Sequence, residues 1–314
     1  HELNPTGQNR HGFKSRQPTR QRNAFDSKKR RKYILSEEKA MSYRIWANHA
    51  HLFPKGAKEN AQIENLKQLM TDCDIEKAVC FTCFENQYKK SGLPGDEIQW
   101  LYDTIKDDDS LIGFGKIDFD KGNITDQVKR IAAFGFKGIK IHPAYQEINI
   151  IGEQAREVYE EAQKQKLFIS FHTGIHWHRI ADYKVLLFDE VSYCYPELRF
   201  SLEHIGGYHF FLDALAVMCN SMRKSDRPTV YAGWTSIAPS ENGLPDFWTQ
   251  SDENLRTVIH QTGNDRSIFG LDFPYKKTDM QLAAIKRIEN LDIPEEAKTG
   301  IFGKNLAEAL NMEW

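Results

Sequence analysis

Eight short β-rich runs alternate with amphipathic helical patterns from residue 43 onward, and this alternation restricts the fold more than any other feature. Apolar residues recur at helical spacing between the runs, as at Ile63, Leu66, Leu69 and Met70. Eight strand–helix units in about 270 residues fit a (β/α)8 barrel. A doubly wound sheet usually has a glycine-rich loop after its first strand, where this chain has histidines. The sequence therefore predicts a TIM barrel with strands at 44–53, 78–83, 111–118, 138–142, 167–172, 198–204, 229–234 and 267–273.

The first forty residues differ in composition from the rest of the chain. Residues 1–40 contain 11 Lys and Arg against 4 Asp and Glu, whereas residues 41–314 contain 31 against 40. Residues 1–32 lack apolar periodicity, so burial could not offset the entropy cost of ordering them. We interpret 1–40 as a basic, disordered extension, with Met41 a candidate natural start, and 41–314 as the barrel domain. A nuclear-targeting or RNA-binding arm is the alternative interpretation.

We expect deletion of residues 1–40 to leave the melting temperature and activity nearly unchanged, because the segment has too little apolar content to pack. Thermal denaturation of the full and shortened chains checks this, and a large drop in melting temperature would refute it.

Composition excludes several classes of protein. A formal net charge of −2 gives the barrel no nucleic-acid signature. No run approaches the ~18 to 20 apolar residues of a membrane span, and no signal peptide is recognisable. The five cysteines are odd in number and dispersed, which favours reduced thiols. We therefore expect a cytoplasmic protein that acts on a small molecule, either as a monomer or as a homodimer.

Metal-ligand residue types stand at the C-terminal ends of predicted strands, where barrel active sites form. In the first strand the alternation predicts that Ile45, Ala47, His49 and His51 share one face, so that two imidazoles point the same way. His172 ends the fifth strand on the face opposite Ile169 and Phe171, and Asp272 lies in the apolar eighth strand. Burying that carboxylate is costly unless a cation compensates. Together His49, His51, His172 and Asp272 predict a divalent metal site.

The residue pattern of 138–142 predicts that a lysine side chain lies beside this site. Its isoleucines would face the helices, while Lys140 and His142 would point into the barrel. They could bind a carboxylate or oxyanion of the substrate. A salt-bridged lysine that only stabilises the barrel is the structural alternative.

Six motifs, in the order and strand context of one family, extend from about Ile45 to Leu310. They are His49-Ala50-His51, Gly138-Ile139-Lys140-Ile141-His142-Pro143, Phe171-His172-Thr173-Gly174, His204-Ile205-Gly206-Gly207, Gly270-Leu271-Asp272-Phe273-Pro274 and Ile301-Phe302-Gly303-Lys304-Asn305-Leu306-Ala307. The sequence thereby resembles the amidohydrolase superfamily, in the amidohydrolase-related branch that includes aminocarboxymuconate-semialdehyde decarboxylase, resorcylate decarboxylases and pyrone-dicarboxylate lactonase. It departs from the family where Ala47, followed by Asn48, replaces a frequent Asp, which affects the support of the first-strand ligands.

The resemblance implies that His49, His51, His172 and Asp272 bind one divalent ion, with zinc expected and manganese the alternative. It implies that the ion activates water, that Asp272 also receives a proton, and that His204 transfers protons or acts as an electrophile. The alternation places His204 on one inward face with Leu202. A binuclear site bridged by a carbamylated Lys140, with His172 and His204 on the second ion, is the other arrangement. His176 and His178 are further, weaker candidates for a second metal.

Loops after the strands would complete the pocket. Trp177 and Arg179 after the fifth strand and Trp234 after the seventh are the candidate substrate contacts, which suits a small anionic substrate. Hydrolysis of a lactone, amide or similar carbonyl compound is the first hypothesis, and non-oxidative decarboxylation is the second. A TatD-type nuclease would need a Gly-Glu ligand where this chain has Gly138-Ile139-Lys140. A non-catalytic binding barrel would not need the full ligand set.

Overall fold

Eight parallel strands pair in chain order, and β8 pairs with β1 to close a barrel. The fold is that of a computed structural model, which describes residues 43–223, 227–239 and 246–314. The strands are β1 (Trp46–His51), β2 (Lys77–Phe81), β3 (Leu111–Lys116), β4 (Gly138–Ile141), β5 (Phe168–His172), β6 (Phe200–Glu203), β7 (Val230–Thr235) and β8 (Ser267–Phe273).

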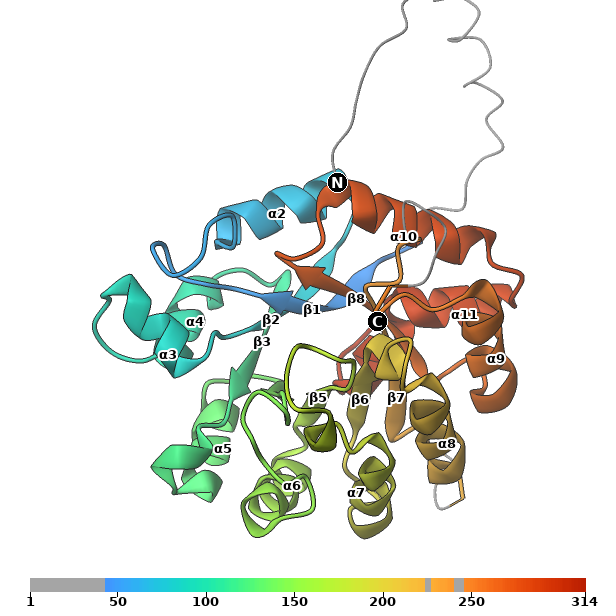
Figure 1. The fold of residues 1–314 in the computed structure, drawn as a ribbon. Helices are drawn as coiled ribbons and strands as arrows, with labels where there is room; N and C mark the ends of the chain where they lie inside the picture. The colour runs from blue at the N-terminus through green and yellow to red at the C-terminus, as the bar shows by residue number, and fades with distance from the viewer. Residues whose placement is uncertain (1–42, 224–226, 240–245) are drawn as a thin grey trace, which may run out of the picture. The chain divides into compact units, whose positions relative to one another are not determined.

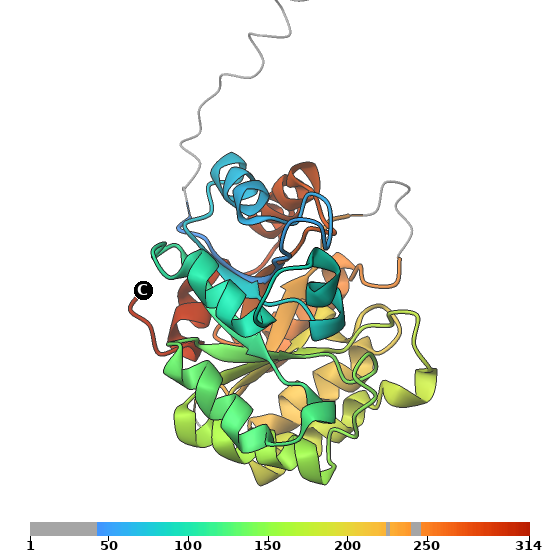
Figure 2. The same ribbon diagram turned by 90° about the vertical axis from the view of Figure 1, so that its left-hand side faces the viewer.

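Helices follow the strands and form a ring around the barrel (Figure 1). Seen after a turn of 90°, helices lie on both sides of the strands (Figure 2). The longer ones are α2 (Ile63–Asp72), α4 (Glu97–Ile105), α5 (Ile124–Ala133), α6 (Glu153–Gln165), α7 (Phe188–Cys194), α8 (Phe211–Ser221), α9 (Asp252–Thr262) and α10 (Thr278–Asn290). The shorter ones are α3 (Glu85–Tyr88), α11 (Glu295–Thr299) and α12 (Asn305–Ala309).

Local sequence explains where these helices begin. The Asp96 side chain accepts hydrogen bonds from the backbone N–H groups of Ile98 and Gln99 at the start of α4. Ser251 accepts one from Asn254 at the start of α9. Such caps satisfy amide groups that have no partner within the helix.

The core has two layers because strand residues alternate between two faces. Ile139 and Ile141 belong to the layer that packs against the helices. Val79, Phe114 and Phe168 fill the barrel interior. The C-terminal α12 joins this interior cluster, and the ring of Trp314 lies 5.3 Å from that of Trp46 at the start of β1. The C-terminal segment therefore closes the end of the barrel opposite the strand C-termini.

The predicted (β/α)8 barrel is confirmed, and all eight predicted strands are present with ends within a few residues. No described helix has the length and apolarity needed to cross a bilayer. The predicted extension, residues 1–40, lies outside the described residues.

Candidate metal centre and active site

The two histidines of β1 reach the interior by a route that the alternation pattern did not predict. Ile45 and Ala47 belong to the layer under the helices, so the prediction that they share a face with His49 is wrong. The pairing of β1 with β2 and β8 shifts register at this point, and His49 has a φ of 72°. This β-bulge changes the direction in which the following side chains point. The imidazoles of His49 and His51 consequently lie together, with ring centroids 5.0 Å apart.

Asp272 at the end of β8 completes a group of three potential ligands. Its Oδ2 accepts a 2.7 Å hydrogen bond from the Ser236 hydroxyl, and its Oδ1 lies 3.7 Å from Nε2 of His49. One potential ligand atom from each of His49, His51 and Asp272 lies within 4.8 Å of the others. Burial raises the pKa of Asp272 despite the Ser236 bond. Two imidazole nitrogens and one carboxylate oxygen are a donor set suited to zinc or manganese.

Glu203, which sequence reasoning missed, fixes the orientation of His49. Its Oε2 lies 2.8 Å from Nδ1 of the fully buried His49. Burial lowers the pKa of His49, so its ring is neutral. With the proton of Nδ1 donated to Glu203, the lone pair is on Nε2, which faces Asp272. A carboxylate that accepts the second N–H of a histidine is the usual support of a metal ligand. Glu203 therefore supplies the support that the frequent Asp, replaced here by Ala47, would give to the first-strand ligands.

Four further donors surround the Glu203 carboxylate, which is fully buried. The Asn48 amide donates at 2.8 Å to Oε1 and the Thr235 hydroxyl at 2.6 Å to Oε2. The Ser170 hydroxyl donates to Oε1 at 3.0 Å, and that of Ser201 makes a short bond to the same oxygen. Gly233 leaves space for the Glu203 carboxylate, since a Cβ at this position would lie 2.6 Å from Oε2. The partners come from β1, β5, β6 and β7, so the network ties four strands together.

His204 lies beside the ligand group and faces the interior as predicted, but Leu202 does not share that face. Leu202 packs under the helices, so the residues of β6 that face the interior are Ser201 and Glu203. His204 turns inward because it and Ile205 have positive φ values of 63° and 51°. Its ring centroid is 5.3 Å from that of His49. Burial and the ammonium of Lys140 lower the pKa of His204 to about 3, which keeps it neutral at pH 7.

His172 lines the same cavity but stands outside the three-residue ligand group. Its ring stacks on His142 with centroids 3.9 Å apart, and its centroid is 4.8 Å from that of His204. Its Nε2 lies 2.7 Å from the carbonyl oxygen of Gly174, so Nδ1 carries the lone pair in the neutral ring. A ligand role for His172 therefore stays a prediction.

Lys140 and His142 point into the barrel, as predicted, and line the cavity. The Lys140 amino group has no hydrogen-bond partner among the described residues, and burial lowers its pKa to about 8. Nδ1 of His142 accepts a hydrogen bond from the backbone N–H of Tyr145 at 3.1 Å, whereas its buried Nε2 has no partner in the part of the chain that the structure describes. Lys116 at the end of β3 joins them, although sequence reasoning did not single it out. Burial lowers the pKa of Lys116 to about 7.

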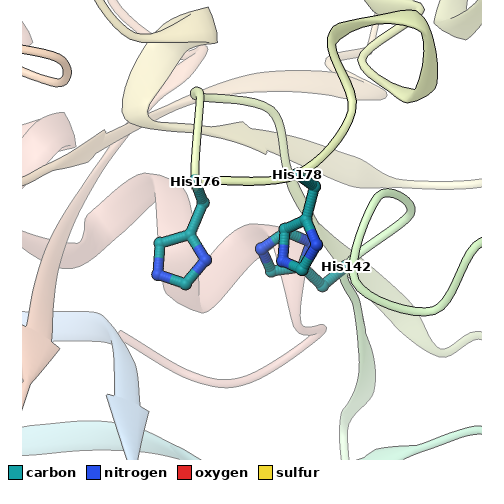
Figure 3. Close-up of side chains that lie close together, drawn as sticks. All are labelled: His142, His176 and His178. Atoms are coloured by element: carbon teal, nitrogen blue, oxygen red, sulfur yellow. The ribbon is translucent and has the colours of Figure 1, made fainter.

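His142 belongs to a second group of histidines, together with His176 and His178, which extend from one loop toward it (Figure 3). Potential ligand atoms of the three lie within 4.8 Å of one another. However, Nδ1 of His142 accepts a hydrogen bond, so the proton of the neutral ring is on Nε2. Metal ligands normally have the reverse arrangement, with the second nitrogen donating. The tautomer therefore favours His142 as a hydrogen-bond donor.

Three predicted loop contacts do not line this cavity. Trp234 is fully buried in the layer under the helices, because the alternation of β7 turns Thr235 inward and Trp234 outward. Trp177 is 73% exposed and packs edge-on against Phe247. Arg179 pairs with Asp182 in the same exposed loop. Aromatic contacts come instead from Phe84, Tyr145, Trp248 and Tyr275.

The cavity that holds these groups has a volume of about 280 Å³. A larger neighbouring cavity of about 550 Å³ shares Phe84, Lys116 and Tyr145 with it, but its other charged groups are mainly carboxylates and it has no histidine. We place the active site in the smaller cavity, because the four predicted metal ligands, His49, His51, His172 and Asp272, all line it. Metal ligands, a neutral histidine and two buried lysines in one enclosed space form an arrangement that can polarise a carbonyl and bind an anion.

Comparisons with known proteins concern the family and the fold of the chain. No curated protein matches the chain in sequence. The 5-carboxyvanillate decarboxylase of Sphingomonas paucimobilis has a similar structure, with 13% identity, a TM-score of 0.63, and coverage of 87% of this chain and 100% of that one. A proposed 2-pyrone-4,6-dicarboxylic acid hydrolase of Pseudomonas putida gives 14% identity and a TM-score of 0.62 over 87% and 100% of the two chains.

A dihydroxybenzoic acid decarboxylase from a Polaromonas species, solved with bound manganese and 2-nitroresorcinol, is also similar. It gives 11% identity and a TM-score of 0.62, over 86% of this chain and 97% of that chain. At such identities these likenesses concern the fold. The family model described as amidohydrolase matches residues 69–311, which is most of the chain and includes His172, His204 and Asp272. The predicted resemblance is confirmed, and the chain belongs to the amidohydrolase family.

Proposed function

We propose that this protein is a metal-dependent hydrolase that cleaves a lactone, an amide or a similar carbonyl compound of a small anionic substrate. The observation that carries the proposal is the position of neutral His204 beside the ligand group of His49, His51 and Asp272. The family uses a divalent metal, and one relative contains manganese. We propose one ion, zinc or manganese.

The residues fit such an ion. His49 presents Nε2 because Glu203 occupies its Nδ1, and Asp272 keeps Oδ1 free because Ser236 bonds only to Oδ2. His51 and His172 complete the proposed ligand set, with His172 offering Nδ1 because its Nε2 is bonded to the Gly174 carbonyl. When bound, a divalent ion polarises a carbonyl oxygen and lowers the pKa of a bound water toward neutrality.

The remaining roles belong to side chains around the ligand group. Asp272 would accept a proton from the attacking water through Oδ1. His204 has a buried Nδ1 without a partner among the described residues, so this atom is available to a substrate. Its neutral ring can exchange a proton with the leaving group. Lys140 and Nε2 of His142 would hold the anionic part of the substrate.

Decarboxylation is the second candidate, because a buried lysine beside a metal site could also hold the carboxylate that leaves. Two of the structurally similar proteins are decarboxylases by name. A binuclear site with carbamylated Lys140 is the alternative for the metal. We do not propose a TatD-type nuclease, since Ile139 and Lys140 stand where that site needs a glutamate.

A substrate panel separates the two reactions. Metal-loaded protein is incubated with lactones, amides and aromatic carboxylates, and the release of acid and of carbon dioxide is measured for each. We expect acid release without carbon dioxide, and no turnover by the Asp272→Asn variant. Carbon dioxide from an aromatic carboxylate, absent with Asp272→Asn, would instead establish the decarboxylase. Equal rates with Asp272→Asn would contradict both.

A further inference from the structure

Two buried lysines lie side by side in the cavity without an anionic partner. Lys116 and Lys140 are register partners on β3 and β4, so their side chains project to the same side of the sheet. Lys116 is 4% exposed and Lys140 is 1% exposed. Within the described ranges, neither forms an ion pair or a hydrogen bond. Each amino group faces an aromatic ring: Nζ of Lys116 lies 3.7 Å from the ring centroid of Phe84, and Nζ of Lys140 lies 5.2 Å from that of Phe81.

This arrangement destabilises the folded chain, because burying an amino group without a partner is unfavourable and two like charges repel each other. Carboxylates nearby offset this destabilisation only in part: Glu203 and Asp272 favour the charged form of Lys140, and Glu97 favours that of Lys116, but none forms an ion pair with either lysine among the described residues. Glu203 is already bonded to five side chains, and Asp272 belongs to the metal-ligand group. Glu97 approaches Lys116 but forms no ion pair with it, and burial raises the pKa of Glu97. Two amino groups that line a cavity without an ion-pair partner among the described residues can bind an anion there.

His142 adds a neutral donor to the same wall. Its Nδ1 accepts a hydrogen bond from the backbone N–H of Tyr145, so Nε2 carries the proton, and residues 43–223, 227–239 and 246–314 provide no acceptor for it. An N–H group of this kind can donate to a carboxylate oxygen. The metal-ligand group lies on β1 and β8, whereas these three donors stand at the ends of β3 and β4. Strand β2 therefore separates Lys116 from the ligands of β1 and β8, whereas His172 on β5, the fourth proposed ligand, stacks on His142.

We propose that Lys116, together with Lys140 and Nε2 of His142, forms a subsite for a carboxylate that does not react. The inference rests on the proposed function, since it concerns the same cavity, and it makes Lys116 a specificity-determining residue. The substrate would carry its reacting carbonyl at the metal ligands and a separate carboxylate at β3 and β4. Phe84, Tyr145 and Tyr275 line the 280 Å³ cavity and could pack against a ring between the two groups.

Binding of non-reacting aromatic acids tests the subsite. Calorimetry on metal-loaded protein compares benzoate, which has one carboxylate, with isophthalate and terephthalate, which have two. We expect one of the two diacids to bind about tenfold tighter than benzoate, or more, because a charge-assisted hydrogen bond is strong in a buried site. The Lys116→Met variant should lose this advantage and keep its metal. Lys137→Met, which removes an exposed lysine just before β4, should retain it.

Stability provides a second readout. If Lys116 only stabilised the barrel, its replacement would lower the melting temperature. Methionine in place of an unpartnered buried amine should leave it unchanged or raise it. An advantage of the diacids that persists in Lys116→Met, or no advantage in the parent protein, would overturn the subsite. The binding comparison does not require turnover, and the metal content is measured separately. A protein that binds the diacids more tightly but hydrolyses nothing would therefore contradict the proposed function and not the subsite.

Discussion

Replacement of Glu203 by glutamine is expected to lower the free energy of unfolding by about 1–3 kcal/mol, the cost of leaving one buried donor without its hydrogen-bond partner. An amide of the same size presents a donor where the carboxylate accepts hydrogen bonds from Asn48, Ser170, Ser201 and Thr235. At least one buried donor would then lose its partner. Denaturant unfolding of the parent and the variant measures the loss.

The same variant should bind metal about 10- to 100-fold more weakly, because Glu203 sets the tautomer of His49. Titration with a competing chelator measures the affinity. Glu76→Gln is the control, since Glu76 pairs with Arg44 on the surface and such pairs contribute only about 0–1 kcal/mol. Unchanged stability and metal affinity in Glu203→Gln would show that the carboxylate does not support the site.

His204→Asn should lower kcat by about 10² to 10⁴ and leave the metal content unchanged. Asparagine has no group that exchanges protons near neutral pH, and His204 stands outside the ligand group of His49, His51 and Asp272. Metal analysis and kcat are measured on one preparation, with a substrate found in the panel. His260→Asn, on the exposed face of α9, is the control.

Other outcomes for His204→Asn also decide between models. With a carbamylated Lys140 and two ions, His204 would be a ligand, and the metal content would fall from two equivalents toward one. Full activity with full metal content would contradict both models and leave His204 as a structural residue of the turn after β6.

The inward-facing residues of a regular strand could be predicted from the sequence. At irregular strand ends the alternation did not predict which neighbouring residues share a face. Lys140 and His142 were placed correctly because β4 alternates without interruption. His49 and His204 point inward as predicted, but Ala47 and Leu202, which were predicted to share their faces, point outward, because each histidine has a positive φ that a period of two cannot represent. Both histidines reach the cavity because the irregular backbone turns their side chains inward.

Glu203 was missed because its role depends on distant partners. Asn48, Ser170 and Thr235 lie on three other strands, and only the closed barrel brings them to one carboxylate. A charged residue in an apolar strand, directly before His204, was the available signal. Lys116, at the end of the third strand, offered a similar signal. Trp234 was misplaced because the inward residue at the end of β7 is Thr235.

The metal content of the purified protein tests the central claim most directly. We predict about one equivalent of a divalent ion in the parent chain, by elemental analysis after dialysis. His49→Ala and Asp272→Ala should lose it, and His260→Ala should keep it. If the His49 and Asp272 variants retained as much metal as the parent, or if the parent bound none when supplied with zinc or manganese, the assignment of the metal centre would be contradicted.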